Sequence, residues 1–419
     1  MPSLAHSIDR RPGEPNGCAP LRDKFCQQSP RVRVRDWRIV ASAGGMPAEC
    51  AIVIPTRNEA ARLAACLEHC RRSIRASGAP ARLVVLVNNS SDDSVGVAMA
   101  WAARQNVALD LVEVELAEGQ AHAGAARRLA FDIGRQCVQA SGVLMTTDAD
   151  SRPERDWVRA NLRAVAEGAA LVCGQIALDA EEAAALPAGF LDAWAVEEKY
   201  AQASLELADL LDPDPHNPWP HHGQISGASL AVTARAYDAV GGLPVVPFGE
   251  DRAFAARLRA FDLPIRCCRA ARVVTSCRLD GRAEGGMAAT IRARLIEADL
   301  HCDDRLEPAL ATGFRARLRG RLRRDWGRPA AIDGRLRRLG LGAHGRQEVF
   351  RHRHFGAAWA SIEALVPALR RVRLERAQLE VELPLLQRLV TSARARYGWA
   401  TTRDSSQQAV PPSREALCS

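Results

Sequence analysis

The chain has 419 residues, of which 47% are hydrophobic and 25% are charged, a composition typical of globular proteins. This length allows one large domain with additions, or two domains. No stretch offers the roughly 18 uninterrupted apolar residues that cross a bilayer, and residues 1–36 lack the apolar segment of a signal peptide. We therefore expect a cytoplasmic protein of bacterial type.

The net charge of +8 is unevenly distributed. Residues 302–419 contain 23 Arg and 12 Asp plus Glu, a net charge of +11, so the rest of the chain carries −3. A basic region of this kind could contact phosphates, anionic lipid or nucleic acid. Lysine, however, occurs only at Lys24 and Lys199. That bias favours arginine as an ordinary surface residue of helices.

The cysteine pattern is that of a reduced protein. The chain has 12 cysteines, and none of them forms a Cys-x-x-Cys pair. Several lie in apolar stretches, so we expect buried free thiols rather than a zinc site or a disulfide framework.

Strands and helices are predicted to alternate from residue 49 onward. Residues 1–45 lack periodicity and are predicted to be disordered or loosely attached. Apolar runs ended by turn residues predict strands at 50–54, 83–87, 109–114 and 142–145. Helices are predicted at 58–77, 94–105 and 123–139. This alternation predicts an α/β fold with a parallel, doubly wound sheet.

The second half of the chain is predicted to be mostly helical. After a helix at 153–167, the elements expected are a strand at 170–176, helical structure at 179–211, a strand at 229–233, a helix from 249 and a strand at 272–276. Residues 212–222 contain four prolines and are predicted to be irregular. We expect a domain at 46–300, an Arg-rich helical extension at 301–400 and a polar tail at 401–419. Within the extension we expect helix breaks at Pro308, Gly327, Gly334, Gly345, Pro367 and Pro384.

Asp148-Ala149-Asp150 follows the apolar run 142–145 and two threonines. Two carboxylates after a buried strand place hard oxygen ligands at the carboxyl end of the sheet, where open α/β sheets bind ligands. Such a pair can hold Mg²⁺ or Mn²⁺ and leave positions open for phosphate oxygens. The alternative is an acidic turn that caps the next helix.

The order of motifs resembles glycosyltransferase family 2. The motifs are Ile52-Val53-Ile54-Pro55-Thr56-Arg57-Asn58-Glu59, a polar turn at 88–93, Gly124 to Arg128, Asp148-x-Asp150 and Glu250-Asp251. The resemblance covers residues 49–285. It implies the GT-A fold, a mixed and mostly parallel sheet flanked by helices, and a nucleoside-diphosphate sugar as donor. The helical extension lies outside it.

For the nucleoside, the resemblance implies Pro55, Thr56 and Glu59 at the end of the first strand. Asn88 and Asn89 stand where the family usually has aspartates that read the base. Asparagine still donates and accepts hydrogen bonds but carries no charge. The choice between UDP and GDP therefore stays open. Asp92 and Asp93 are interpreted as helix N-caps or as further base contacts.

For the diphosphate, the resemblance implies Arg127 and Arg128, near Gly119 and Gly124, since guanidinium groups match phosphate in charge and geometry. Alternatively, one of these two arginines faces solvent. Asp148 is expected to bind the ribose or the metal, and Asp150 the metal itself.

Glu250-Asp251 is the second acidic pair. By resemblance, Asp251 is the base that takes the proton of the acceptor hydroxyl in an inverting transfer, and Glu250 positions the acceptor. The alternatives are a helix start with acids favoured by its dipole, or a retaining enzyme of the same fold in which Asp251 is no base. Gly227, upstream of this pair, suits close approach of the sugar to the backbone.

Two further segments are candidate parts of the site. Arg278 and Arg282 lie in a glycine-containing segment that could close over the diphosphate, or form a solvated surface loop. His216, His221 and His222 lie in the proline-rich loop; one of them could bind metal or acceptor, but surface positions are favoured.

The acceptor is expected to be a small molecule or a lipid-linked hydroxyl, reached by a single transfer, because the Gln-x-x-Arg-Trp motif of processive synthases is absent. A nucleotidyltransferase is disfavoured because the first strand is followed by Thr56-Arg57-Asn58-Glu59 and not by a Gly-rich, Lys-containing loop. A non-catalytic basic binding protein is the remaining alternative. Nucleic acid is not expected as a partner, because aromatic residues for base stacking are few beyond residue 302. Peripheral contact with a membrane and homodimer formation stay open.

Overall fold

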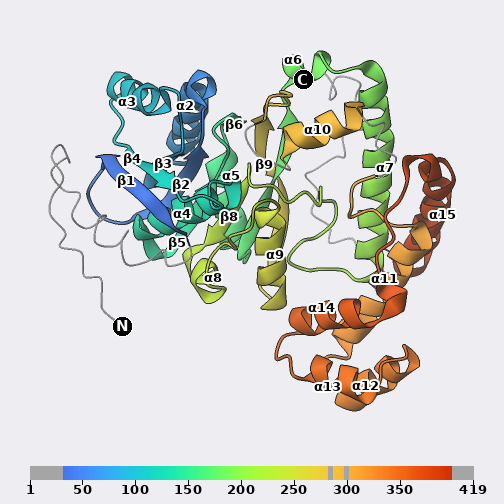
Figure 1. The fold of residues 1–419 in the computed structure, drawn as a ribbon. Coiled ribbons are helices and arrows are strands. Elements are labelled where there is room, and N and C mark those ends of the chain that lie inside the picture. The colour runs from blue at the N-terminus through green and yellow to red at the C-terminus, as the bar shows by residue number, and fades with distance from the viewer. Residues whose placement is uncertain (1–31, 282–285, 297–301, 399–419) are drawn as a thin grey trace. The chain divides into compact units, whose positions relative to one another are not determined.

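The computed structural model describes residues 32–281, 286–296 and 302–398. These residues form two compact units (Figure 1). The first unit contains the described residues 32–162 and 226–254, and the second contains 163–225, 255–281, 286–296 and 302–398. The chain thus passes from one unit to the other within the region 46–300. The domain boundaries named from the sequence stay a prediction.

The first unit is built on a mostly parallel set of strands. Its strands are β1 (Val34–Ala41), β2 (Ala48–Thr56), β3 (Ala81–Asn88), β4 (Asp110–Leu116), β5 (Val138–Thr146), β6 (Ser151–Pro153) and β8 (Leu230–Thr233). Six of them are ordered β1-β4-β3-β2-β5-β8. The central strands β4, β3, β2 and β5 are parallel, whereas β1 and β8 pair antiparallel with β4 and β5. The α/β fold class is confirmed.

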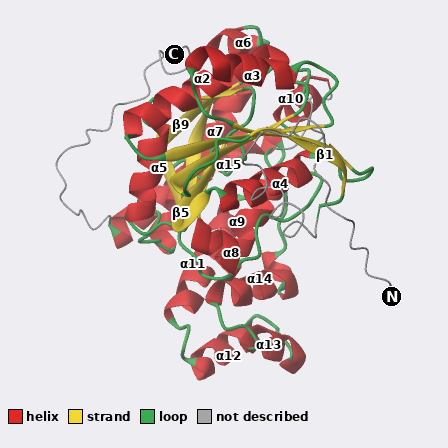
Figure 2. Cartoon of the chain, turned by 90° about the vertical axis from the view of Figure 1, so that its left-hand side faces the viewer, coloured by secondary structure: helices red, strands yellow, loops and turns green. Residues whose placement is uncertain are grey.

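Helices cover both faces of these strands. The first unit contains α2 (Ala60–Ser77), α3 (Ser94–Gln105), α4 (Ala123–Gln136) and α8 (Ala234–Ala239), and the first turns of α5 (Trp157–Ala166) and α9 (Glu250–Ala260). Helices α2 and α3 lie over one face and α4 over the opposite face (Figures 1 and 2). Ile52, Ile54, Leu67 and Phe131 are completely buried in the core between these layers. The apolar runs from which the central strands were predicted therefore form the interior of this core.

Strand β1 corrects the prediction that residues 1–45 lack order. Residues 34–41 pair antiparallel with β4, with Trp37 opposite Val114 and Ile39 opposite Val112. An ion pair between Arg38 and Glu113 lies across the same two strands at 2.5 Å. The strand could not be recognised from its polar sequence, because β1 is stabilised by its cross-strand neighbours and not by an apolar run. The rest of the segment, residues 1–31, lies outside the described residues.

The second unit combines two parallel strands with helices. The strands are β7 (Leu171–Leu178) and β9 (Ile265–Thr275), and β9 begins seven residues before the predicted strand at 272. The helices are α6 (Ala180–Ala184), α7 (Ala188–Leu211), α10 (Met287–Ile296), α11 (Ala309–Arg324), α12 (Pro329–Arg338), α13 (Ala343–Phe350), α14 (Phe355–Leu365), α15 (Leu379–Tyr397) and two 3-10 turns, η1 (Pro367–Leu369) and η2 (Arg376–Gln378).

The Arg-rich extension is helical, as predicted, but not all of its breaks are where we expected them. Pro308 caps α11 and Gly327 separates α11 from α12, whereas Gly334, Gly345 and Pro384 lie inside helices. Helix α15, which contains Pro384, packs against α7 and α11 around buried apolar side chains, and α12 and α13, which contain the two glycines, contribute to a second buried cluster. This packing overrides the intrinsic tendency of proline and glycine to interrupt helices.

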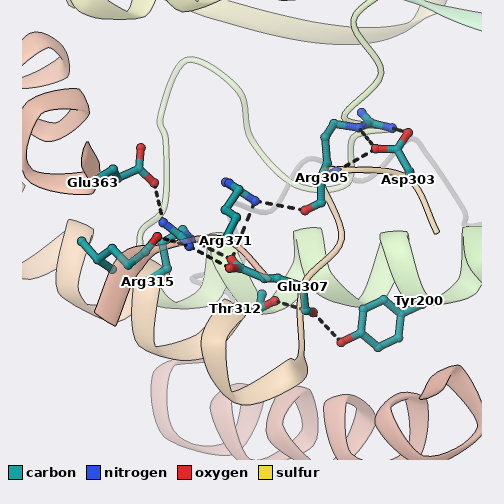
Figure 3. Close-up of polar contacts among 9 residues, drawn as sticks. Tyr200, Asp303, Arg305, Glu307, Thr312, Arg315, Glu363 and Arg371 are labelled. Atoms are coloured by element: carbon teal, nitrogen blue, oxygen red, sulfur yellow. Dashed lines mark hydrogen bonds and ion pairs between the residues drawn. The ribbon is translucent and has the colours of Figure 1, made fainter. Parts of the chain in front are cut away.

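A buried ion-pair network fixes the start of α11 in the second unit (Figure 3). Both carboxylate oxygens of Glu307 bind the guanidinium of Arg315, at 2.7 and 2.8 Å, and Glu363 binds the same guanidinium at 2.7 Å. The hydroxyl of Tyr200 donates to the backbone oxygen of Glu307 at 2.8 Å. Because these charges are buried and paired, removing one partner would leave the other as an uncompensated buried charge and destabilise the fold.

Among the described residues, no helix has both the length and the apolar character needed to cross a bilayer.

Candidate functional site

The polar turns that follow β2 and β3 interlock. Asn58 Oδ1 accepts a hydrogen bond from the backbone nitrogen of Ser91 at 2.7 Å, and Asp92 Oδ2 accepts one from Ala60 at the start of α2 at 2.8 Å. Asp93 Oδ1 accepts from Gly96 and caps α3. Asp92 and Asp93 are therefore helix caps, one of their two predicted roles, and they hold the carboxyl ends of both strands in place.

The residues predicted to hold the nucleoside lie at these same strand ends. Pro55 and Thr56 are the last residues of β2, and Asn88 is the last of β3. Asn89 uses its side-chain amide on the backbone of Leu116, donating to its oxygen at 3.2 Å and accepting from its nitrogen at 3.1 Å. The Asn89 side chain thus continues the strand pairing into β4. Glu59, the residue before α2, is buried. The nucleoside roles of all five residues stay predictions.

Arg127 is the centre of the contact network that joins the two acidic motifs. Its guanidinium binds Glu250 Oε1 through Nε at 3.0 Å and Asp148 Oδ1 through Nη2 at 2.7 Å. Its Nη1 donates to Thr146 Oγ1 at 3.0 Å and to the backbone oxygen of Gly227 at 2.9 Å. Four of its five N–H donors are thus bound to protein oxygens, so the side chain has one defined position.

The charge of Arg127 is retained despite burial. Burial alone would lower the pKa of Arg127, but Asp148 and Glu250 outweigh it and raise the pKa above its ordinary value. The guanidinium is therefore a permanent positive charge that bridges the carboxyl end of β5 and the start of α9.

Arg128 faces the protein interior and corrects the alternative that one of the two arginines faces solvent. Its Nε donates to Asp132 at 2.7 Å, and its Nη1 donates to the backbone oxygens of Gly241 and Leu243 at 2.8 and 2.9 Å. Tyr237 donates to the other oxygen of Asp132 at 2.6 Å. These contacts give Arg128 a structural role in anchoring α8, and its predicted contact with a diphosphate stays a prediction.

Asp148 and Asp150 lie just beyond the carboxyl end of β5. Arg127 engages one oxygen of Asp148, whose side chain is 36% exposed, so the other oxygen can accept a further ligand. Within the described residues, no group of three or more His, Cys, Asp or Glu is arranged to enclose a metal ion. Two carboxylates suit a divalent ion that takes its remaining ligands from phosphate and water, as Mg²⁺ commonly does.

Asp251 is oriented by two backbone amides. Gly227 donates to Asp251 Oδ2 at 3.0 Å, and Arg252 donates to Oδ1 at 2.6 Å. Each carboxylate oxygen keeps a second lone pair, so the group can still take up a proton. Burial, and next to it the charge of Glu250, raises the pKa of Asp251 above its ordinary value. Asp251 is thus a stronger base than a solvated aspartate.

Gly227 connects these groups through its backbone and was not predicted to do so. Its oxygen binds Arg127 and its nitrogen binds Asp251. A Cβ at this position would lie 2.5 Å from the guanidinium carbon of Arg127, which explains the glycine. The sequence signal was present in Gly227-Ala228-Ser229, but it gave no indication of which side chains would approach.

His122 is a second residue that the sequence reasoning missed. Its Nδ1 accepts a hydrogen bond from Ala125 at 3.2 Å and so caps α4, the helix that carries Arg127. Burial lowers the pKa of His122, and the nearby charge of Glu250 opposes this effect. The signal available in the sequence was a histidine directly before a helix start.

The remaining candidates belong to the second unit or fall outside the described residues. Arg278 is in the second unit, and its predicted role stays a prediction. Arg282 lies outside the described residues. His216 is exposed as expected, whereas His221 and His222 are buried, each 4% exposed, so their predicted surface position is wrong.

A comparison with protein families gives one match. Residues 51–187 match the family described as glycosyl transferase family 2. The matched segment runs from β2 to the start of α7 and includes the strand ends, Arg127 and the Asp148–Asp150 motif. Among curated proteins, none matches the sequence significantly.

Solved structures give distant likenesses. The mannosyltransferase PcManGT from Pyrobaculum calidifontis, in complex with GDP-Man and Mn²⁺, has 15% sequence identity and a TM-score of 0.40, with 90% of this chain and 93% of that chain covered. Residues 1–349 of TarS from S. aureus, in complex with UDP-GlcNAc, have 12% identity and a TM-score of 0.40, with 84% and 89% covered. Glucosyl-3-phosphoglycerate synthase from Mycobacterium tuberculosis, in complex with Mn²⁺, UDP and phosphoglyceric acid, has 16% identity and a TM-score of 0.33, with 69% and 84% covered. Likenesses this distant identify neither donor nor acceptor.

Proposed function

This chain belongs to glycosyltransferase family 2 through residues 51–187, and on that premise we propose that it moves a sugar from a nucleoside-diphosphate donor to a hydroxyl acceptor, with inversion and with the help of a divalent metal. The observation that carries the proposal is the joining of both acidic motifs by one buried arginine. Arg127 contacts Asp148 on one side and Glu250 on the other, and Gly227 links Arg127 to Asp251.

The charge balance of this network supports a metal at Asp148 and Asp150. Arg127 is a single positive charge in contact with a group that includes Asp148, Glu250 and Asp251. A donor diphosphate would add further negative charge. Bound Mg²⁺ or Mn²⁺ would neutralise the diphosphate and stabilise it as the leaving group. Asp148 and Asp150 would hold the ion, and Arg127 would keep Asp148 in position for it.

Asp251 would take the proton of the attacking hydroxyl. Its two backbone hydrogen bonds fix the carboxylate without using both lone pairs of either oxygen, and its raised pKa favours proton uptake. Glu250 would hold Arg127 and, through it, the relative positions of the two acidic motifs. In a retaining enzyme of the same fold, Asp251 would not act as base, and the anomeric configuration of the product separates the two outcomes.

One face of α11 supports an anionic partner in the second unit. Leu310 and Phe314 are 64% and 44% exposed, and Arg317, Arg321 and Arg324 continue the same helical face, also exposed. In the described part of the chain, no carboxylate pairs with these three arginines. Cationic side chains beside exposed apolar ones are typical of helices that lie on anionic membranes. We therefore propose peripheral contact with such a membrane, which suits a lipid-linked acceptor.

The other expectations stay predictions. No contact among the described residues argues for a reaction in the cytoplasm of a bacterium, for a soluble acceptor in place of a lipid-linked one, or for a homodimer. A nucleotidyltransferase remains disfavoured, because the turn after β2 is Arg57-Asn58-Glu59 and is occupied by hydrogen bonds to the β3–α3 turn.

The test is a donor screen followed by product analysis. UDP- and GDP-sugars are added to the full chain with and without Mn²⁺, and the melting temperature is recorded. The correct donor raises it by mass action, and more so with Mn²⁺. The anomeric configuration of the sugar transferred from that donor is then read by NMR. Absence of any metal-dependent shift across all donors, or transfer of a nucleotidyl group, would overturn the proposal.

A further inference from the structure

The second unit contains a cluster of nucleophilic and titratable groups that the proposed transfer does not use. Cys267 on β9 lies opposite Cys173 on β7 in the strand register. His221 contacts Cys267, and His221 Nε2 lies 2.8 Å from Asp209 Oδ2. Cysteine, histidine and aspartate thus follow one another in contact, with a second cysteine beside the first on the neighbouring strand.

The geometry of the two cysteines allows a bond between them. Neighbouring strands lie about 4.8 Å apart, and disulfides join residues whose Cα atoms are roughly 4.4–6.8 Å apart. Residues in register on adjacent strands direct their side chains to the same face, and the Cys173 thiol contacts the Cys267 sulfur. Cys173 is completely buried, whereas Cys267 is partly exposed. Cys267 is therefore the member of the pair that a small reagent can reach.

Several groups around Cys267 favour its thiolate. The Cys173 thiol lowers the pKa of Cys267; burial opposes this, and His221 adds to the lowering. Burial would lower the pKa of His221, but its pairing with Asp209, 2.8 Å away, and its contact with Cys267 raise it to about 9. The groups that face the sulfur thus include an imidazolium held by a carboxylate, a pairing that activates cysteines.

The remaining neighbours of the sulfur are compatible with this state. Burial lowers the pKa of His222, which favours the neutral form of this second imidazole. Arg269, on β9, donates to the backbone oxygen of His221 at 3.3 Å and adds positive charge nearby. The backbone oxygen of Gln224 is 3.9 Å from the Cys267 sulfur, a long distance for a hydrogen bond from a thiol.

We propose that Cys267 is an oxidation site, a nucleophilic thiolate that reacts with hydroperoxides, and that Cys173 resolves the product into an intramolecular disulfide. Low-pKa, accessible cysteines beside a resolving thiol are the ones that oxidise reversibly. None of these residues belongs to the contact network around Arg127.

The chemistry balances in two steps. The Cys267 thiolate attacks one peroxide oxygen, the O–O bond breaks, and the leaving oxygen takes the proton of the His221 imidazolium. This gives a sulfenic acid, neutral His221 and water, or an alcohol from an organic hydroperoxide. The Cys173 sulfur then attacks the Cys267 sulfur and gives up its proton. The S–O bond breaks, and the departing hydroxide takes that proton and leaves as water. Two thiols have lost two electrons, and the peroxide has gained them.

The chain contains a second pair of contacting cysteines, which controls for contact between thiols but not for exposure. Cys66 and Cys70 contact each other in α2, as Cys173 and Cys267 do between strands. Both of these cysteines are buried, and the Cys66 thiol donates to the backbone oxygen of Asp148 at 3.3 Å. Contact between two thiols is thus common to both pairs, whereas the imidazolium belongs to the Cys267 pair.

The experiment uses the reduced full chain. Iodoacetamide at pH 6 is applied for increasing times, and labelled peptides are quantified by mass spectrometry. Cys267 should be alkylated at least about tenfold faster than Cys268, the next residue of β9, which is also partly exposed but lies opposite Gly174. Hydrogen peroxide should then join Cys173 to Cys267 in one peptide pair and leave Cys66 and Cys70 reduced. In Cys173→Ser, a 1,3-dione should trap the sulfenic acid at Cys267, and His221→Gln should slow both reactions.

The wild-type measurements decide the proposal even where a variant does not fold. Equal labelling rates for Cys267 and Cys268, or a peroxide-induced disulfide that leaves out Cys267, would overturn it. So would oxidation of Cys267 that stops at the sulfenic acid in the wild type, because Cys173 would then not be the resolving thiol.

Discussion

Arg127 Nε and Glu250 Oε1 lie 3.0 Å apart, although 123 residues separate them in the chain. Both side chains are less than a tenth exposed. The same guanidinium reaches Asp148 at 2.7 Å. A single buried cation therefore decides how the start of α9 is placed against the end of β5, and the acidic motifs depend on it for their common location.

Replacing this cation should damage both stability and transfer. Arg127→Met leaves Glu250 buried without its partner, and breaking a buried pair from one side costs about 3–5 kcal/mol. We expect a loss of that size in the free energy of unfolding, measured by urea denaturation. Arg163→Gln is the control, because the Arg163 side chain is 80% exposed and its pair with Glu167 should contribute only about 0–1 kcal/mol. Equal effects of the two changes would show that the buried network is not stabilising.

The raised pKa of Asp251 predicts the pH dependence of transfer. A base must be deprotonated, so kcat/KM should rise with pH and reach half its limit above about 3.9, the ordinary value for aspartate. Asp251→Asn should lose the activity at every pH while the donor-induced rise in melting temperature remains. A pH profile that is unchanged in a partly active Asp251→Asn variant would remove Asp251 from the role of base.

The same shift makes a prediction for stability. Because the pKa is raised on folding, the folded chain keeps this proton at pH values where the unfolded chain has lost it. The contribution of Asp251 to stability is therefore fully present at low pH and declines as pH rises from the unfolded pKa through the raised folded one. Denaturation at several pH values gives the free energies of unfolding of wild type and Asp251→Asn. The value for the wild type should fall relative to that of the variant as pH rises.

Gly227 should tolerate no side chain. A Cβ there would lie 2.5 Å from the guanidinium carbon of Arg127, so Gly227→Ala must displace that side chain or the backbone. We expect a loss of about 1–3 kcal/mol in stability, together with a large drop in kcat. Gly334→Ala is the control: this glycine is inside α12 with nothing within 4 Å of a new Cβ, so alanine should be neutral or stabilise by up to about 1 kcal/mol. A fully active Gly227→Ala enzyme would contradict the positioning argument.

The sequence predicted the fold well where apolar runs decide it. The strands β2, β3, β4 and β5 were found because their residues are buried on both sides, and such strands read as continuous apolar runs. Strand β1 was missed because its stability comes from pairing with β4, which no local pattern announces. The same reason applies to the early start of β9, where Cys267 lies.

The residues of the candidate site were predicted, but the contacts between them were not. Asp148 and Asp251 were named from motifs, and each is in the contact network. The role of Arg127 as a bridge could not be predicted, because its partners come from three distant parts of the chain. The burial of His221 was missed for a similar reason: the proline-rich loop reads as polar, yet tertiary contacts with Asp209 and Cys267 enclose it.

The metal proposal predicts a specific defect in Asp150→Asn. With the correct donor, Mn²⁺ should raise the melting temperature of the wild type further than donor alone, because a bound ion stabilises the folded state by mass action. The variant should lose the Mn²⁺-dependent part of that rise. Asp156→Asn removes the same charge from an exposed pair with Arg159 and should behave as wild type. Retention of the full Mn²⁺ effect in Asp150→Asn would exclude this carboxylate as a ligand.

The exposed face of α11 predicts binding to anionic vesicles. Each arginine near such a surface contributes about 1 kcal/mol, so Arg317→Gln, Arg321→Gln and Arg324→Gln together should weaken binding by roughly a hundredfold, and added salt should weaken the wild type in the same direction. Flotation with phosphatidylglycerol vesicles measures the loss, and neutral phosphatidylcholine vesicles give the background.

The control variant has the same net charge as the α11 variant but loses its three arginines elsewhere in the second unit. Arg338→Gln, Arg353→Gln and Arg388→Gln remove three exposed arginines from other helices and loops. If charge alone drives binding, both triple variants lose it equally and the α11 face is not the contact. If the face is the contact, the control binds as wild type, and Leu310→Ser with Phe314→Ser weakens binding further without changing its salt dependence, because these side chains contribute apolar burial and no charge.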